Sequence, residues 1–106
     1  LPGGFMDFGE TWQQACVREL YEETGISISS EAISLFDVHS PPDGKLVLIF
    51  GLAPAMKMAE LPEFVPNEEV LAWTILKEFE PLAFPLHTLV AKTFFEKYLK
   101  KYFFIV

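Results

Sequence analysis

The sequence predicts an α/β fold, because stretches with helical spacing alternate with short apolar stretches typical of β-strands. Its 106 residues suit one domain, and we expect that domain to span residues 1–106. A hydrophobic content of 51% argues against disorder and is enough for a modest core.

The first expected element is a helix over residues 11–24. Thr11 is a good N-cap residue, and Gln14, three residues later, completes a capping box. Gly25 follows the helix and can take the left-handed conformation that ends one. The local signals therefore predict both ends of this helix.

One face of this helix is expected to be buried. Trp12, Cys16 and Leu20 recur at helical spacing. Cys16 is the only cysteine, which excludes an internal disulfide and a multi-cysteine zinc site. We interpret it as a small apolar residue of the core.

A β-hairpin is expected next. Residues 33–40 and 45–53 have strand composition, and the sequence "PPDG" between them is typical of a turn. The second stretch, "KLVLIFGLA", is almost continuously apolar. Such a run predicts a strand that is covered on both faces.

The rest of the chain predicts a further strand and a second helix. Residues 59–67 form an irregular connection, and residues 70–76 ("VLAWTIL") have strand composition. After the loop "PLAFP", apolar residues recur every four positions over residues 86–102 and predict a helix. The apolar end "YFFIV" is expected either to pack under the sheet or to contact another subunit.

The charge balance limits the partners. The formal net charge is −7 and the pI is about 4.7, so general binding to the nucleic-acid backbone is not expected. An anionic substrate would need cations to mediate its binding. No apolar run reaches the roughly 18 residues that a membrane helix needs, and without a visible leader we expect a cytoplasmic protein.

Three carboxylates crowd together near the end of the first helix. Glu19, Glu22 and Glu23 share one helix face, where their charges repel unless a cation neutralises them. Ligands that are all oxygen favour the hard divalent ions Mg²⁺ or Mn²⁺. The alternative is a solvated acidic helix face without a ligand.

The surrounding residues favour the metal interpretation. The stretch "GGFMDFGETWQQACVRELYEETGI" resembles the signature box of the Nudix hydrolase family at every fixed position of that motif. Those fixed positions are Gly4, Glu10, Arg18, Glu19, Leu20, Glu22, Glu23, Gly25 and Ile26.

The resemblance implies a fold as well. Family members are α/β/α sandwiches, with a mixed β-sheet between the box helix and a C-terminal helix. They usually carry strands ahead of the box, whereas this sequence begins at the box. We therefore expect a fragment that lacks its N-terminal strands; the alternative is an unusually short version of the domain.

The resemblance also implies a metal centre at a diphosphate. Glu22 and Glu23 would be the principal ligands, and Glu19 would be a further ligand or the base that activates water. The backbone carbonyl of Gly3 would supply another oxygen. Divalent ions would provide the positive charge that the diphosphate requires, and a carboxylate would accept the proton of the attacking water.

Two further box residues are expected to support the catalytic carboxylates. By the same resemblance, Glu10 and Arg18 would form a pair, because an arginine fork can hold a carboxylate through two contacts. Gly4 and Gly25 are expected to serve backbone geometry. Asp7, in the variable part of the box, is expected to be an exposed loop residue.

Outside the box, the family pattern suggests one more catalytic glutamate. The stretch "PNEEVLAW" offers Glu68 and Glu69, of which we prefer Glu69 because it lies at the junction between loop and strand. The alternative is a loop charge that faces solvent. Trp73 and Phe84 could stack on a base, although core packing is the preferred interpretation for Trp73. His87 is expected to lie in the first turn of the last helix.

The substrate implied is a nucleoside diphosphate linked to another moiety. The segments "LPGGFMDFGET", "SPPDGK" and "PLAFP" resemble the ADP-ribose and FAD pyrophosphatase branch, whose reaction releases a nucleoside monophosphate. The first alternative is a house-cleaning nucleoside-triphosphate pyrophosphohydrolase. The second is a non-catalytic nucleotide-binding module, which the complete set of box glutamates disfavours. Many relatives dimerise, so a homodimer is compatible with the apolar C-terminal end.

Overall fold

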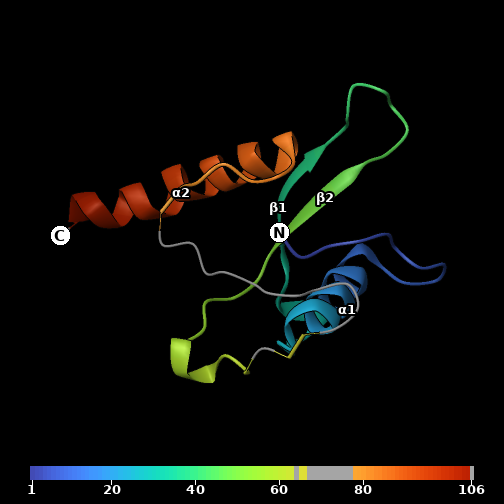
Figure 1. Ribbon diagram of the computed structural model, residues 1–106, viewed down its shortest axis with the longest axis horizontal. Helices are drawn as coiled ribbons and strands as arrows, with labels where there is room; N and C mark the ends of the chain where they lie inside the picture. Colours follow the sequence, from blue (N-terminus) through green and yellow to red (C-terminus); the bar gives the residue numbers. More distant parts are fainter. Residues whose placement is uncertain (64, 67–77, 106) are drawn as a thin grey trace. The chain divides into compact units, whose positions relative to one another are not determined.

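The structure is a computed structural model that describes residues 1–63, 65–66 and 78–105 (Figure 1). The chain divides into two compact units, Leu1–Trp73 and Thr74–Val106. Helices and an antiparallel sheet confirm the predicted α/β class. The elements in chain order are α1 (Trp12–Thr24), the 3₁₀ turn η1 (Ser30–Ala32), β1 (Ser34–His39), β2 (Leu48–Leu52), the 3₁₀ turn η2 (Met58–Glu60) and α2 (Pro85–Ile105).

Helix α1 begins and ends where the local signals predicted. The Thr11 hydroxyl accepts a hydrogen bond of 3.1 Å from the Gln14 N–H, and the Gln14 side chain accepts one of 2.9 Å from the Thr11 N–H. This reciprocal pair satisfies two amide donors that the first turn would otherwise leave unpaired. Gly25 has a φ of 76°, and its N–H bonds to the Tyr21 carbonyl at 2.8 Å. The predicted capping box and left-handed cap are both confirmed.

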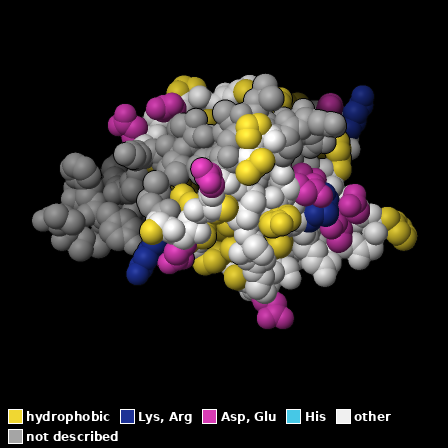
Figure 2. Space-filling view, turned by 60° about the horizontal axis from the view of Figure 1, so that its bottom comes forward, with side chains coloured by type: hydrophobic (Ala, Val, Ile, Leu, Met, Phe, Trp, Pro, Cys, Tyr) yellow, Lys and Arg dark blue, Asp and Glu magenta, His cyan; other side chains and the backbone are white. Residues whose placement is uncertain are grey.

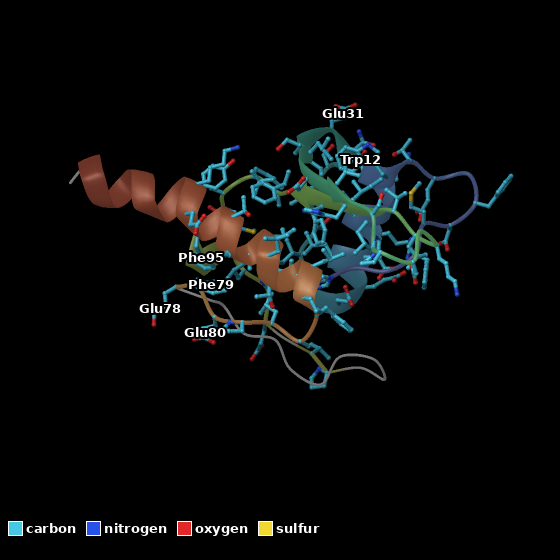
Figure 3. The ribbon with its side chains drawn as sticks, turned by 90° about the horizontal axis from the view of Figure 1, so that it is seen from above. Trp12, Glu31, Glu78, Phe79, Glu80 and Phe95 are labelled. Atoms are coloured by element: carbon cyan, nitrogen blue, oxygen red, sulfur yellow. The ribbon has the colours of Figure 1, made fainter. Side chains whose placement is uncertain are left out.

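The buried face of α1 packs against β2 at a glycine. A Cβ atom built on Gly51 would lie 3.1 Å from Cys16 Sγ and 3.5 Å from Trp12 Cζ3, so both side chains approach the strand backbone closely. Figure 3 shows Trp12 beside the hairpin strands. Ala15 is the buried residue of this helix, whereas Leu20 is half-buried. Burial raises the pKa of the Cys16 thiol, which is consistent with a packing role for this cysteine.

Strands β1 and β2 form the predicted hairpin. They pair antiparallel, with Ser34 opposite Leu52 and His39 opposite Leu48, and the register is interrupted by a bulge that follows Leu35. In the connecting turn, Gly44 has a φ of 67°, and its N–H bonds to the carbonyl of residue 41 at 3.0 Å. Glycine adopts this left-handed conformation without the steric cost of a Cβ.

The prediction that the second strand is covered on both faces is wrong for the part of the chain that the structure describes. Strand β2 is shorter than the apolar run, and the side chains of its nonglycine residues are half-buried. Leu46 and Val47 precede it in the hairpin loop and are 45% and 62% exposed. The apolar run includes loop residues, and its hydrophobicity alone does not determine which faces are covered.

In the second unit, the "PLAFP" loop is bonded to the start of α2. The Thr88 hydroxyl accepts a hydrogen bond of 2.9 Å from the Leu82 N–H and donates one of 3.1 Å to the Leu82 carbonyl. Proline suits the first helical position, where its missing N–H is not needed, and α2 begins at Pro85. The predicted helix is confirmed and extends to Ile105, so most of the apolar C-terminal end is helical.

The third strand and the packing of α2 on the sheet are two predictions that the described residues do not test. The strand expected over residues 70–76 lies outside the described residues, so the mixed sheet stays a prediction. The described strands make a two-stranded antiparallel sheet. The packing of α2 on that sheet also stays a prediction. Within the described residues, neither helix combines the length and the apolar character needed to cross a membrane.

Candidate active site

Arg18 lies on the acidic face of α1, and its guanidinium contacts several box carboxylates. Nη2 lies 2.7 Å from Glu10 Oε1, and Nη1 lies 2.8 Å from Glu19 Oε1. Nη1 also lies 3.3 Å from Glu22 Oε2, one helical turn further along. Figure 2 shows acidic side chains crowded against basic side-chain atoms on one face of the molecule. The guanidinium therefore gathers three of the predicted site residues.

The strength of these contacts differs with exposure. The side chains of Glu10 and Glu19 are each 15% exposed and that of Arg18 is 26% exposed, whereas that of Glu22 is 53% exposed. Solvent weakens exposed ion pairs, so the contacts with Glu10 and Glu19 hold the guanidinium most firmly. The hydrogen bonds that Arg18 donates to Glu10 and then to Glu19 raise the pKa of Arg18 further above its already high value.

The loop before α1 fixes Glu10 from a second side. The Asp7 N–H donates a hydrogen bond of 2.6 Å to Glu10 Oε1, and the Glu10 N–H bonds to the Asp7 carbonyl at 3.2 Å. Gly9, with a φ of 92°, allows the chain to turn between them. The hydrogen bond from Arg18 and then that from the Asp7 backbone lower the pKa of Glu10. The carboxylate is therefore held in its charged form.

Asp7 is a site contact that sequence reasoning missed. Its Oδ2 lies 3.3 Å from Arg18 Nε, although its side chain is 72% exposed, as expected for a loop residue. A signal was available in the sequence, because Asp7 stands three residues before Glu10 in a segment that Gly9 allows to turn. That spacing returns its backbone and side chain toward the pair of Glu10 and Arg18.

The backbone of residues 3–5 runs along the acidic face of α1. The Gly3 N–H donates a hydrogen bond of 2.7 Å to Glu23 Oε2, and the Phe5 carbonyl accepts one of 2.9 Å from Arg18 Nη2. Gly3 was expected to contribute its carbonyl to a metal ion. The structure adds that its amide holds one of the two principal candidate ligands.

Gly4 lies directly against Glu19. A Cβ atom built on Gly4 would lie 2.8 Å from Glu19 Oε2 and closer still to Oε1. The absence of a side chain at residue 4 therefore leaves a recess that the Glu19 carboxylate fills.

The remaining predicted residues lie outside the described residues or in the second unit. Glu68, Glu69 and Trp73 lie outside the described residues. In the second unit, Phe84 is 65% exposed and its ring lies 5.3 Å from that of His87, in the first turn of α2 as expected.

The cluster fits a hard divalent ion in its chemistry. All the candidate ligands offer oxygen atoms. The single positive charge of Arg18 does not balance the negative charges of the carboxylates around it. In the described residues, no three Asp, Glu, His or Cys side chains converge on a point suited to a metal ion. Glu19 and Glu22 are turned toward the guanidinium, and Glu23 is turned toward Gly3. A metal ion would therefore require these carboxylates to exchange partners.

The motif, the capped acidic helix and the Arg18 cluster define the class of protein. The family model described as NUDIX domain matches residues 1–98, and the chain belongs to this family. Over 43 residues, the chain is 51% identical to a protein of Methanocaldococcus jannaschii named ADP-ribose pyrophosphatase. That match covers 41% of this chain and 24% of the relative, so the aligned part spans less than a third of the relative's length. No solved structure matches the chain significantly.

Proposed function

We propose that the protein hydrolyses the phosphoric anhydride bond of a nucleoside diphosphate linked to another moiety, with an ADP-ribose- or FAD-like substrate and with Mg²⁺ or Mn²⁺. The observation that carries this proposal is the gathering of the box carboxylates around Arg18 at one face of α1. The named pyrophosphatase relative supports the choice of substrate class.

Glu22, Glu23 and the Gly3 carbonyl are the proposed metal ligands. A bound divalent ion supplies positive charge that offsets the charge of the diphosphate oxygens. The hydrogen bond from the Gly3 N–H to Glu23 keeps Gly3, whose carbonyl is a proposed ligand, close to the Glu23 carboxylate. The acidic protein thereby acquires the positive charge that its own residues do not supply.

Glu19 is proposed to accept the proton of the attacking water, or to serve as a further ligand. Arg18 holds Oε1, whereas Oε2 accepts no hydrogen bond from the residues that the structure describes. As the water oxygen bonds to one phosphorus atom, the bond from that phosphorus to the bridging oxygen breaks. The water proton passes to Glu19, and the products are a nucleoside monophosphate and a second phosphate ester.

Arg18 and Glu10 are proposed to position Glu19 rather than to react. Glu10 accepts hydrogen bonds from Nε and Nη2 of Arg18, which leaves Nη1 directed at Glu19. Glu69 is proposed as a further catalytic carboxylate, as the family pattern suggests. The homodimer and the cytoplasmic location expected from the sequence stay predictions.

A hydrolysis panel on the full-length protein tests the proposed function. ADP-ribose, FAD and an oxidised deoxyguanosine triphosphate are each incubated with Mg²⁺ or Mn²⁺, and the products are separated and counted. We expect metal-dependent release of a nucleoside monophosphate from ADP-ribose or FAD. Release of pyrophosphate from the triphosphate alone would instead support the house-cleaning alternative.

The substitution Glu22→Gln tests the ligand assignment. It removes a charged oxygen donor and keeps the shape of the side chain. Loss of a residue that only hydrogen-bonds to a metal ligand typically lowers activity about 10- to 100-fold. Loss of a ligand itself should have a larger effect, so we expect Glu22→Gln to abolish metal-dependent turnover. Glu31→Gln is the matched control, because Glu31 is an exposed glutamate in η1 (Figure 3). Unchanged turnover in Glu22→Gln would refute the assignment.

A further inference from the structure

The close approach of Glu19 to Gly4 has a consequence for catalysis. All three terminal atoms of the Glu19 side chain lie within 3 Å of the position that a Cβ on residue 4 would take. Separations this short between nonbonded carbon and oxygen atoms are repulsive, since nonbonded heavy atoms sit best at about 3.5–4.0 Å. An alanine at residue 4 and the present Glu19 position are therefore incompatible.

The backbone conformation of Gly4 gives no other reason for a glycine. The glycines with a positive φ are Gly9, Gly25 and Gly44, and Gly4 is not among them. A positive φ is therefore not the reason for a glycine here, whereas the recess requires the absence of a side chain.

We propose that Gly4 is a positioning residue for Glu19: its missing side chain forms one wall of the recess that holds the carboxylate where Arg18 anchors it. Arg18 holds the same carboxylate, because its Nη1 lies 2.8 Å from Glu19 Oε1. The Glu19 side chain is 15% exposed, so few alternative positions are open to its carboxylate without loss of that contact.

The cost of filling the recess should appear in turnover more than in stability. A new methyl group can be accommodated if the end of the Glu19 side chain swings aside, because that end is flexible and no backbone atom has to move. The swing displaces the group proposed to receive the proton, and a misplacement of about 1 Å can cost about 100-fold in rate. The kinetic part of this inference rests on the proposed function of Glu19.

The test is a double-mutant cycle on the full-length protein with Gly4→Ala and Glu19→Gln. We expect Gly4→Ala to lower kcat about 10- to 100-fold while KM for the nucleotide stays unchanged. In the Glu19→Gln background, the same alanine should cause no further loss, because its only route to the reaction has already been removed. An equal loss in both backgrounds, or wild-type kcat in Gly4→Ala, overturns the proposal.

Gly44→Ala is the control for destabilisation by itself. Gly44 lies in the hairpin turn with a φ of 67°, so an alanine there is strained and contacts no box residue. We expect it to lower the midpoint of thermal unfolding and to keep wild-type kcat. A matching loss of kcat in this control would mean that general destabilisation explains Gly4→Ala, which also overturns the proposal.

A second readout is independent of turnover. In the metal-free protein, the guanidinium NMR signals of Arg18, identified by their loss in Arg18→Lys, report the hydrogen bond to Glu19. Gly4→Ala should shift the Nη signals, whereas Gly44→Ala should leave them in place. Unchanged Nη signals in Gly4→Ala overturn the proposal. If the wild type hydrolyses nothing in the panel, the proposed function fails and this readout alone decides the role of Gly4.

Discussion

Arg18 differs from a lysine at the same position in the number of atoms that it can direct at carboxylates. Its planar fork reaches Glu10 through Nε and Nη2, Glu19 through Nη1, and the Phe5 carbonyl through Nη2. A lysine offers one compact ammonium and could not hold this arrangement. The residue therefore acts as a rigid spacer between carboxylates that would otherwise repel.

The depressed pKa of Glu10 predicts a contribution to acid stability. In the folded protein, the pKa of Glu10 lies below its ordinary value of 4.5. Glu10 therefore stabilises the folded state above pH 4.5, and this stabilisation is lost as the pH falls through the lower pKa of the folded state. Glu10→Gln should therefore flatten the decline of the unfolding free energy below about pH 4.5. Chemical denaturation from pH 6 to pH 3 measures this slope.

Glu31→Gln controls for the change in net charge in that experiment, since Glu31 is exposed in η1. If Glu10→Gln and the wild type lose stability in parallel as the pH falls, the pair of Glu10 and Arg18 does not carry the expected linkage.

At the scale of elements, helix α1 is attached to the hairpin through a position without a side chain. A Cβ on Gly51 would lie 2.8 Å from Ile33 Cγ2 and 3.1 Å from Cys16 Sγ. Because Gly51 has no side chain, the strand backbone can approach α1 more closely than it could with any other residue at position 51. Since the box carboxylates are carried by α1 and by the loop before it, this contact ties them to the rest of the first unit.

Gly51→Ala is expected to destabilise the fold. Overpacking of this kind typically costs about 1–3 kcal/mol, which outweighs the roughly 0.4–1 kcal/mol that alanine gains by restricting the unfolded chain. Denaturant unfolding of the full-length protein measures the difference. Gly3→Ala is the matched stability control, because a Cβ there meets nothing within 4 Å. Equal stability of the two variants would contradict the close packing at Gly51.

At the scale of the whole molecule, the net charge of −7 and the crowded carboxylates predict that divalent ions stabilise the protein. A ligand at about 100 times its Kd adds about 2.7 kcal/mol to the unfolding free energy. Mg²⁺ or Mn²⁺ should therefore raise the thermal midpoint, and EDTA should reverse the increase.

NaCl at matched ionic strength separates site binding from general screening of the acidic surface. The variant carrying both Glu22→Gln and Glu23→Gln should lose the response to divalent ions. An increase of equal size with NaCl, or in that variant, would show that the ions do not bind at the box.

The sequence by itself determined the family, the ends of α1 and the position of the hairpin turn. Each of these follows from residues that lie close together in the chain. The capping box joins Thr11 to Gln14, three residues apart, and Gly25 ends the helix through its own backbone conformation. The resemblance of the box to the family motif also predicted that Glu10 and Arg18 would pair.

Only the tertiary structure decided which groups surround the carboxylates. The bond between Gly3 and Glu23 spans 20 residues, and that between Arg18 and the Phe5 carbonyl spans 13. The recess at Gly4 likewise exists only because the loop folds back on α1. Such contacts depend on the path of the chain through space, which short-range periodicity and capping signals do not specify.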